Sequence, residues 1–318
     1  MLFASAQLMH IPDGFLSVVV SVILWILSVA AIAWALRRVN ADMDERKLPL
    51  MGVLAAAIFA GQMLNFAVTG GTSGHLMGAA IATILLGPWA AVLVITAVVG
   101  IQALIFQDGG ILALGANIFN MGVVGVAVSY FTYRTVMRLT GGRKWGIFAG
   151  GFAAGWLSIV VAALGVALQL ALSGASPANL AVPAMGAIHA LIGVGEGLIT
   201  VGALAFIYAA RPALLDERNG SAPMGKAVWV GGLLIAVLLA VLAPLASANP
   251  DGLEWVAEQR GFLDRGQEPL YNIIPDYVFP GISNEAVATI LAGIVGVLLV
   301  LAVVAGLAYS RRNRPAQP

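Results

Sequence analysis

The stretch LMGAAIATILLGPWAAVLVITAVVGIQALIF, residues 76–106, decides the fold of this chain. It is apolar almost throughout, but Gly87-Pro88 interrupts it. It can be read as one kinked helix, or as a short helix (Leu76–Leu86) followed by a full one (Pro88–Phe106). The two-helix reading, with the N-terminus outside the cell, puts every Lys and Arg except Arg260 and Arg265 on the cytoplasmic side. The fused reading moves most of them outside, so the positive-inside rule predicts two helices with a tight turn.

Composition makes the chain a multi-span membrane protein. It has 318 residues, of which 60% are hydrophobic and 10% charged, with a mean hydropathy of +0.96, whereas soluble domains carry about 25% charged residues. We therefore expect an all-α polytopic membrane protein, with a seven-helix bundle followed by a two-helix C-terminal appendix. The expected helices are Phe15–Leu36, Leu48–Val68, Leu76–Leu86, Pro88–Phe106, Leu112–Val136, Trp145–Leu172, Ala184–Ala210, Ala227–Ala246 and Ala286–Tyr309. The absence of cysteine excludes disulfides, thiolate metal sites and cysteine nucleophiles.

A polar, turn-rich segment at 211–226 divides bundle from appendix and is expected to be a cytoplasmic linker. With this orientation the loop 247–285 is extracytoplasmic and acidic, and the C-terminus is cytoplasmic. An acidic outer face attracts cations, although acidic loops also remain simply because basic residues stay inside.

Two of the three histidines are expected at the same outer face, which suggests a metal site built from nitrogen. His10 lies in Met9-His10-Ile11-Pro12-Asp13-Gly14, and His75 ends Gly70-Gly71-Thr72-Ser73-Gly74-His75. If Met9 were the first residue, its amine, the amide nitrogen of His10 and the His10 imidazole could close fused chelate rings, and His75 could complete a square plane. That geometry suits Ni(II) or Cu(II), and Co(II) less well. The alternatives are an interfacial His10, and a helix cap at Thr72 or Ser73 with an incidental His75.

Other polar residues within the apolar segments are weaker candidates. His189 and Glu196 are seven residues apart on one helix face and form either a structural or a coupling pair. Asn65, Asn117, Asn120 and, nearby in sequence, Asp13 could orient the imidazoles; the amides, with Gln102 and Gln107, could equally join helices. Glycine motifs at 151–155 and 193–197 predict close helix contact.

Enzymatic and ATP-binding motifs are lacking. Gly220–Ala227 resembles a phosphate-binding loop, but Ala227 replaces the residue that would hold magnesium. We find no catalytic or cofactor-binding residues, and no ATP site, in the sequence.

Several separate motifs resemble one family of membrane proteins. They are Met9–Leu16, Gly70–His75, Leu86–Ala90, Gly109–Asn117 and His189–Gly193. Together they are similar to the CbiM/NikM family, the substrate-binding membrane components of energy-coupling-factor transporters for cobalt and nickel. Pro250-Asp251-Gly252-Leu253-Glu254 resembles the PDGLE domain, a NikN-like small component fused to some members.

The resemblance implies a metal-binding domain at 9–210, a linker at 211–226 and a PDGLE domain at 227–318. It implies metal ligation by the amine of Met9, the backbone and imidazole nitrogens of His10, and His75, with Ni2+ or Co2+ as transported substrate. The eight residues before Met9 depart from the family pattern, so we predict that Met9 is the mature first residue.

The family also implies partners, namely an energy-coupling membrane subunit and two ATP-binding-cassette ATPase subunits, in the inner membrane of a prokaryote. The outside loop 247–285 would gate or load the metal site. The alternatives are a stand-alone proton-coupled transporter of divalent metal using His189 and Glu196, which usually shows inverted repeats, and a metalloenzyme with Asp13 as its base. The choice between nickel and cobalt stays open.

Overall fold

The structure is a computed structural model that describes residues 9–42, 48–215 and 226–312. The residues before Met9 and most of the expected linker (216–225) lie outside the described residues. The helices are α1 (Val18–Asp42), α2 (Leu48–Gln62), α3 (Ala79–Leu86), α4 (Pro88–Ile105), α5 (Leu114–Asn117), α6 (Val126–Leu139), α7 (Lys144–Leu172), α8 (Ala178–Ala210), α9 (Lys226–Leu242), α10 (Gly252–Arg260) and α11 (Glu285–Arg312). The strands are β1 (Phe66–Val68) and β2 (Thr72–Gly74).

The predicted fold class is confirmed. Within the described residues, six helical segments are long and apolar enough to cross a membrane, and two shorter apolar helices accompany them at 49–62 and 229–245. One long segment, 114–139, is continuous from α5 to α6 through a π-helical stretch, Ile118–Gly125. The chain is therefore a mostly helical polytopic membrane protein.

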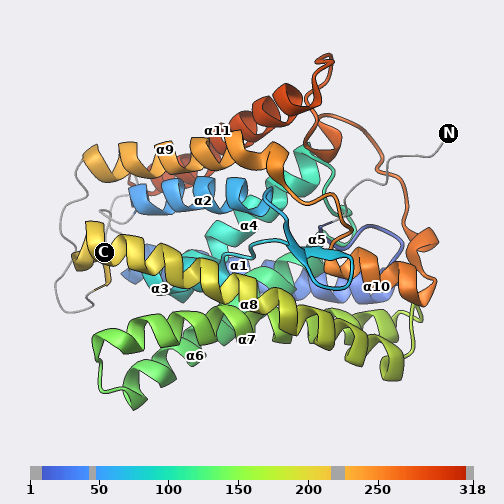
Figure 1. Ribbon diagram of the computed structural model, residues 1–318, viewed down its shortest axis with the longest axis horizontal. Coiled ribbons are helices and arrows are strands. Elements are labelled where there is room, and N and C mark those ends of the chain that lie inside the picture. The colour runs from blue at the N-terminus through green and yellow to red at the C-terminus, as the bar shows by residue number, and fades with distance from the viewer. Residues whose placement is uncertain (1–8, 43–47, 216–225, 313–318) are drawn as a thin grey trace.

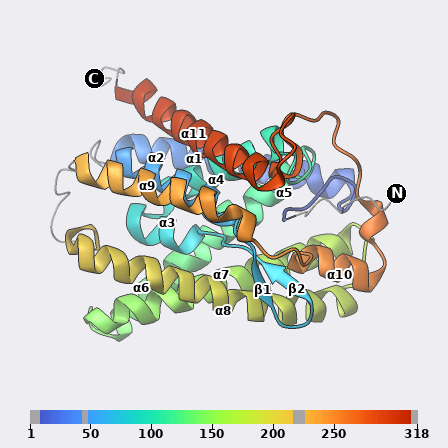
Figure 2. The same cartoon turned by 45° about the horizontal axis from the view of Figure 1, so that its top comes forward.

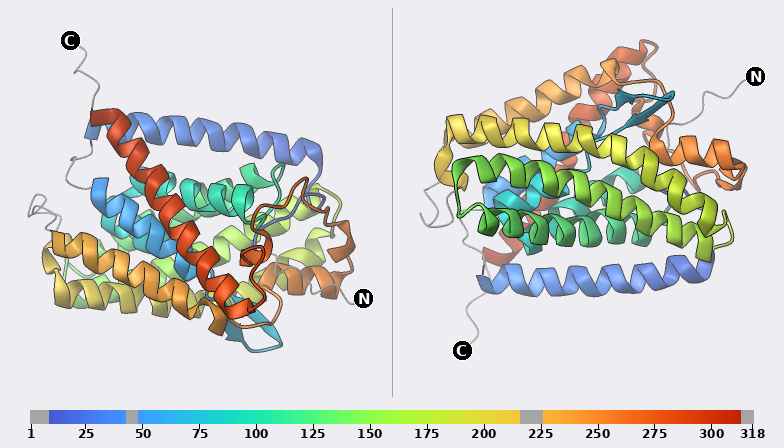
Figure 3. Two further views of the ribbon diagram at one scale, coloured as in Figure 1. Left: turned by 90° about the horizontal axis from the view of Figure 1, so that it is seen from above. Right: turned by 60° about the horizontal axis from the view of Figure 1, so that its bottom comes forward.

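The helices run along one common direction and form two groups around α4 (Figure 1). In one group α7 packs lengthwise against α8, with α6 on α7; in the other α9 and α11 cover α2. Helix α1 lies along the outside of the bundle (Figure 3). Only 22% of the residues in its apolar 18-residue stretch are buried. Its exposed large apolar side chains are Val, Ile and Leu, with Trp34 near the C-terminal end, as expected of a helix facing lipid.

The interruption at Gly87-Pro88 splits residues 76–106 into two helices, as predicted. Gly87 has φ 83° and ψ 167°, a conformation that favours glycine, and Pro88 occupies the first turn of α4. Helix α3 has only eight residues and is buried by its neighbours, which explains how so short a helix fits.

A β-hairpin replaces part of the expected second helix, and this is a correction. Helix α2 ends at Gln62 rather than Val68, and β1 pairs with β2 through a turn in which Gly70 and Gly71 have positive φ. The glycines before His75 thus serve the turn. Thr72 and Ser73 do not cap α3, whose cap residue is Gly78, and Leu76 precedes that helix.

Several helix starts differ from the prediction, and the largest difference is at α8. Helix α8 begins at Ala178 instead of Ala184, because Pro183 lies inside the helix and does not mark its start. The predicted contact between the two glycine motifs is present: a Cβ at Gly155 would lie 3.2 Å from the Cα of Gly197.

The segment between α9 and α11 covers one end of the bundle. Helix α10 lies beside the β-hairpin (Figure 2), and the chain then crosses this end before α11 begins. Two backbone hydrogen bonds anchor the crossing to the end of α4, from Ile274 N to Ile105 O (3.0 Å) and from Asp276 N to Phe106 O (3.2 Å).

Candidate metal centre

The segment that carries His10 is buried at the covered end of the bundle. His10 is 2% exposed, and Met9 and Ile11 on either side are also buried. The side chain of Asn117 holds this segment: its Oδ1 accepts from Ile11 N (3.0 Å) and its Nδ2 donates to Ile11 O (3.1 Å). Asn117 therefore positions the backbone next to His10 rather than the imidazole itself.

Asp13 also acts on the backbone. Its Oδ1 accepts from Ala113 N (2.8 Å), and its carbonyl accepts from Gln267 N (2.8 Å) in the segment between α10 and α11. The neighbouring Gly14 has φ 92°, and a Cβ there would lie 2.0 Å from Arg265 O. Two separate parts of the chain thus hold the N-terminal segment, and any larger residue at position 14 would disturb it.

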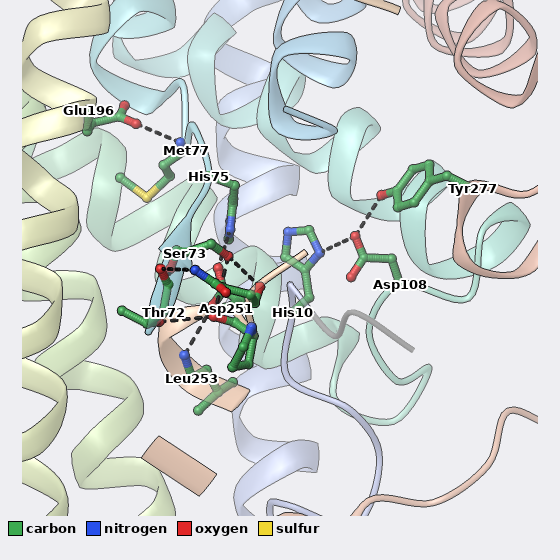
Figure 4. A network of polar contacts seen from close by, with 12 residues as sticks. His10, Thr72, Ser73, His75, Met77, Asp108, Glu196, Asp251, Leu253 and Tyr277 are labelled. Atoms are coloured by element: carbon green, nitrogen blue, oxygen red, sulfur yellow. Dashed lines mark hydrogen bonds and ion pairs between the residues drawn. The ribbon is translucent and has the colours of Figure 1, made fainter. Parts of the chain in front are cut away.

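The structure brings His10 and His75 together. Their ring centroids are 5.5 Å apart, with an angle of 59° between the rings. His75 follows β2 directly, and His10 lies on the loop that leads to α1 (Figure 4). Residues 65 positions apart in sequence therefore meet at one point, as two ligands of a common ion must.

The His10 ring faces Asp108, which follows α4. Nδ1 of His10 lies 3.0 Å from Oδ2 of Asp108, at ion-pair distance but without hydrogen-bond geometry. Tyr277 donates its hydroxyl to the same Oδ2 at 2.6 Å. Burial alone would raise the pKa of Asp108, but the charge of His10 and the Tyr277 hydroxyl hold it below its ordinary value. Burial and the Asp108 charge raise the pKa of Tyr277 well above its ordinary value, so the phenol stays a donor.

The His75 ring faces Asp251, the aspartate of the Pro250–Glu254 motif. Nδ1 of His75 lies 2.8 Å from Oδ2 of Asp251. Burial alone would lower the pKa of His75, but the charge and hydrogen bond of Asp251 raise it above its ordinary value. Each imidazole therefore has one carboxylate on its Nδ1 side (Figure 4).

His189 and Glu196 do not pair with each other. Both oxygens of Glu196 accept backbone bonds from the residues after His75, from Met77 N (2.7 Å) and Gly78 N (3.1 Å). Nδ1 of His189 bonds to Met185 O within its own helix (2.8 Å). Glu196 thus holds the loop between His75 and α3, which is the structural alternative for this residue.

The structure gives Asn65 and Asn120 no hydrogen bond to either imidazole. Asn120 exchanges two 2.8 Å hydrogen bonds with Gln169 and so joins the π-helical stretch to α7. The Asn65 carbonyl accepts from Ser247 N (2.8 Å), and its buried side-chain Oδ1 has no hydrogen-bond partner. Neither residue orients His10 or His75.

Sequence reasoning missed Asp108, Asp251 and Tyr277 as partners of the imidazoles. In the sequence, Asp108 and Asp251 are two of many acidic residues expected on the outer face. No sequence pattern marks Tyr277 as a partner of a histidine. Among the described residues, no three His, Asp or Glu side chains converge as ligands of one ion. Two imidazoles alone would not complete a metal site, and a bound ion would need further donors.

Comparison with known proteins identifies the family. The CbiM family, described as a cobalt-uptake substrate-specific transmembrane region, matches residues 10–214, and the PDGLE domain matches residues 226–313. The chain belongs to the CbiM family, with a PDGLE domain fused behind it. It is thus a component of cobalt or nickel transport.

Relatives of this CbiM protein share both parts. The chain is 40% identical over 97% of its length to a protein of Archaeoglobus fulgidus named "Putative fused nickel transport protein NikMN", of which it covers 100%. It is 33% identical over 92% of its length to the "Fused nickel transport protein NikMN" of Rhodobacter capsulatus, of which it covers 95%. A solved "Truncated Transition metal Transporter" is 34% identical with a TM-score of 0.57; the match covers 64% of this chain and 99% of that one. These matches place the chain among transport proteins.

Proposed function

We propose that this chain is the substrate-binding membrane subunit of an ATP-driven energy-coupling-factor importer for nickel or cobalt ions. The observation that carries the proposal is the meeting of His10 and His75, with centroids 5.5 Å apart, at one buried end of the bundle. The chain itself contains no usable ATP-binding motif, as expected of a capture subunit that relies on separate ATPases. The metal is the cargo, and its transient binding is the function.

The amine of Met9 and the backbone nitrogen of His10 complete the proposed ligand set. A deprotonated amide would cancel one of the two positive charges of the ion and so lower the cost of burying it. In this mode His10 must use Nδ1, because only that ring nitrogen can close a six-membered ring with its own backbone nitrogen. Nδ1 faces Asp108 in the structure, so capture would require the ring to turn about its Cβ–Cγ bond.

Nickel is the favoured cargo. A plane of four nitrogen ligands suits Ni(II) better than Co(II), and two relatives that match both parts of the chain are named nickel transport proteins. The same geometry suits Cu(II), so copper belongs in the test as a competitor.

The test compares two versions of the full chain in detergent, one starting at Met9 and one retaining Met1, with the first residue verified by intact mass. The Met9 version is expected to bind one Ni(II) with the absorption of a square nitrogen complex. The Met1 version, His10→Ala and His75→Ala should each lose that spectrum, while Asp264→Asn, an exposed control, should keep it. Stoichiometric binding by a verified Met1 version would contradict the ligand set.

The proposed orientation puts the His10 end outside the cell in the inner membrane of a prokaryote. Because the chain has no cysteine, Glu268→Cys introduces a single label site in the exposed loop. A membrane-impermeant maleimide should label it in intact cells, and labelling only after lysis would reverse the orientation.

The proposed partners are a coupling membrane subunit and two ATPase subunits. Nickel uptake in cells should require all of them and should stop when the ATPases cannot hydrolyse ATP. Uptake by this chain alone would instead support the proton-coupled transporter, which the separate partners of His189 and Glu196 do not favour.

A further inference from the structure

The Pro250–Glu254 motif folds as a helix start that presents one carboxylate in two directions. Asp251 is the N-cap of α10, and its Oδ1 accepts from Leu253 N at 3.1 Å. Glu254 stands three residues later, where a capping box has its second acidic side chain. The Asp251 side chain is thus held by its own helix through one oxygen, while Oδ2 remains free for another donor.

That second oxygen receives His75. The distance from Oδ2 of Asp251 to Nδ1 of His75 is 2.8 Å, and Asp251 is only 3% exposed. Gly252, the next residue, leaves no room for a side chain, because a Cβ would lie 2.6 Å from Cδ1 of Ile192 on α8. The motif is therefore packed closely against the CbiM part of the chain.

Further bonds join Asn249 and Pro250 to β2, the strand that leads to His75. Ser73 N donates to Pro250 O (2.8 Å), Thr72 Oγ1 donates to Pro250 O (3.0 Å) and Ser73 Oγ donates to Asn249 O (2.9 Å). Residues 249–251 thereby hold both the ring of His75 and the strand that precedes it. The contact is specific in register, since a shift of one residue would break all of these bonds.

We propose that Asp251 is a positioning residue for metal capture, and that the PDGLE domain completes the metal centre through it. A carboxylate only accepts hydrogen bonds, so the proton of the His75 ring must sit on Nδ1. Nε2 then carries the lone pair and is the atom that binds the ion. This inference rests on the proposed function of His75 as a metal ligand. In it, Asp251 of the PDGLE motif determines which nitrogen of the His75 ring carries the proton.

Three variants of the full Met9-started chain separate this role from a structural one. Asp251→Asn keeps the cap through its amide oxygen but presents an NH2 group to His75, which favours the wrong tautomer. Asp251→Ser keeps the cap but is too short to reach the ring. Asp264→Asn is the exposed control.

Two readouts are needed, the Kd for Ni(II) and the 15N shifts of the histidine ring nitrogens in the metal-free protein. With only three histidines in the chain, His10→Ala and His189→Ala suffice to assign the His75 signals. At a pH high enough to make the ring neutral, the wild type should show His75 protonated at Nδ1. Loss of an outer contact to a ligand costs about 10- to 100-fold in affinity, so we expect about 100-fold for Asp251→Asn, about 10-fold for Asp251→Ser and no change for the control.

The order of the two Asp251 variants in Ni(II) affinity distinguishes a positioning role from a structural one. If Asp251 were merely structural, the closely similar Asn would be the mildest change and Ser the worse one, and this order would overturn the proposal. A neutral wild-type His75 ring that carries its proton on Nε2 would overturn it as well. If the wild type binds no metal, the proposed function fails, while the ring shifts still report whether Asp251 sets the tautomer.

Discussion

The two halves of the proposed metal centre are held in different ways. His10 faces Asp108, which belongs to the CbiM part and follows α4 directly, and the other end of that carboxylate receives Tyr277 from the segment before α11. His75 faces Asp251, which belongs to the PDGLE domain itself. The His10 half therefore has a carboxylate of its own and uses the C-terminal domain only as support, whereas the His75 half depends on that domain for its partner.

The comparison explains why a fused two-part chain suits this site. A covalent fusion keeps Asp251 and Tyr277 close to the two imidazoles without a separate binding step. In the structure, Tyr277 stacks on Phe106 with centroids 4.9 Å apart, and both residues of the Asp276-Tyr277 pair have positive φ. The backbone there adopts an uncommon conformation at the point where it reaches the site.

Removing Asp108 from the His10 half should cause the largest loss of stability among the variants considered. Asp108→Ala leaves the buried Tyr277 hydroxyl without its acceptor and the His10 ring without its charged partner. Because unpartnered buried groups that faced a charge are costly, we expect a loss of about 3 kcal/mol in the free energy of unfolding. Thermal unfolding of the metal-free protein in detergent measures it, with Asp264→Ala as the exposed control; equal stability of the two variants would show that Asp108 is not part of a folded network.

Tyr277→Phe should have a smaller effect, since it removes one donor and keeps the stacked ring. A hydrogen bond to a charged group contributes about 1.5–3 kcal/mol, and we expect a value near the lower end here. Comparison with Asp108→Ala in the same unfolding assay, together with the double variant, gives the share of the C-terminal domain in the His10 half. Additive losses would mean that the two residues act independently, against the arrangement described above.

Glu254→Gln tests the His75 half, and of the three variants it should change the free energy of unfolding least. Burial, with Glu258 and Asp251 nearby, raises the pKa of Glu254 to about 7 from 4.5. Burial favours the neutral carboxyl of Glu254. The stability that this neutral side chain contributes is therefore fully present below pH 4.5 and is lost as the pH rises through 7 and the side chain becomes charged. Glutamine stays neutral and keeps the capping position.

The variant should consequently gain stability over the wild type between pH 5 and pH 8, by on the order of 1 kcal/mol. The measurement is the difference in Tm between the two proteins at each pH. A difference that does not change with pH would mean that Glu254 titrates normally and that α10 does not bury it.

Much of the fold could be predicted from the sequence. Apolar runs of the right length show each membrane-crossing helix, and the distribution of Lys and Arg predicts the break at Gly87-Pro88, which the structure confirms. The β-hairpin at 66–74 and helix α10 were not predicted, because short segments owe their conformation to their neighbours more than to their own periodicity.

The candidate ligands could also be found in advance, but their partners could not. Asp108, Asp251 and Tyr277 lie far from the histidines in sequence and carry no spacing that reports on contact. Conversely, the spacing of His189 and Glu196 indicated a pair, yet His189 bonds to a carbonyl of its own helix and Glu196 bonds to the loop that follows His75.

The amino-acid sequence by itself determined the class of protein, the number and order of its apolar segments and the two histidines, because hydropathy, charge and rare residue types are properties of the linear chain. Only the tertiary structure decided which carboxylate each imidazole faces and which domain supplies it. Those contacts join residues 98 and 176 positions apart, and such pairings arise from how helices pack rather than from any local pattern.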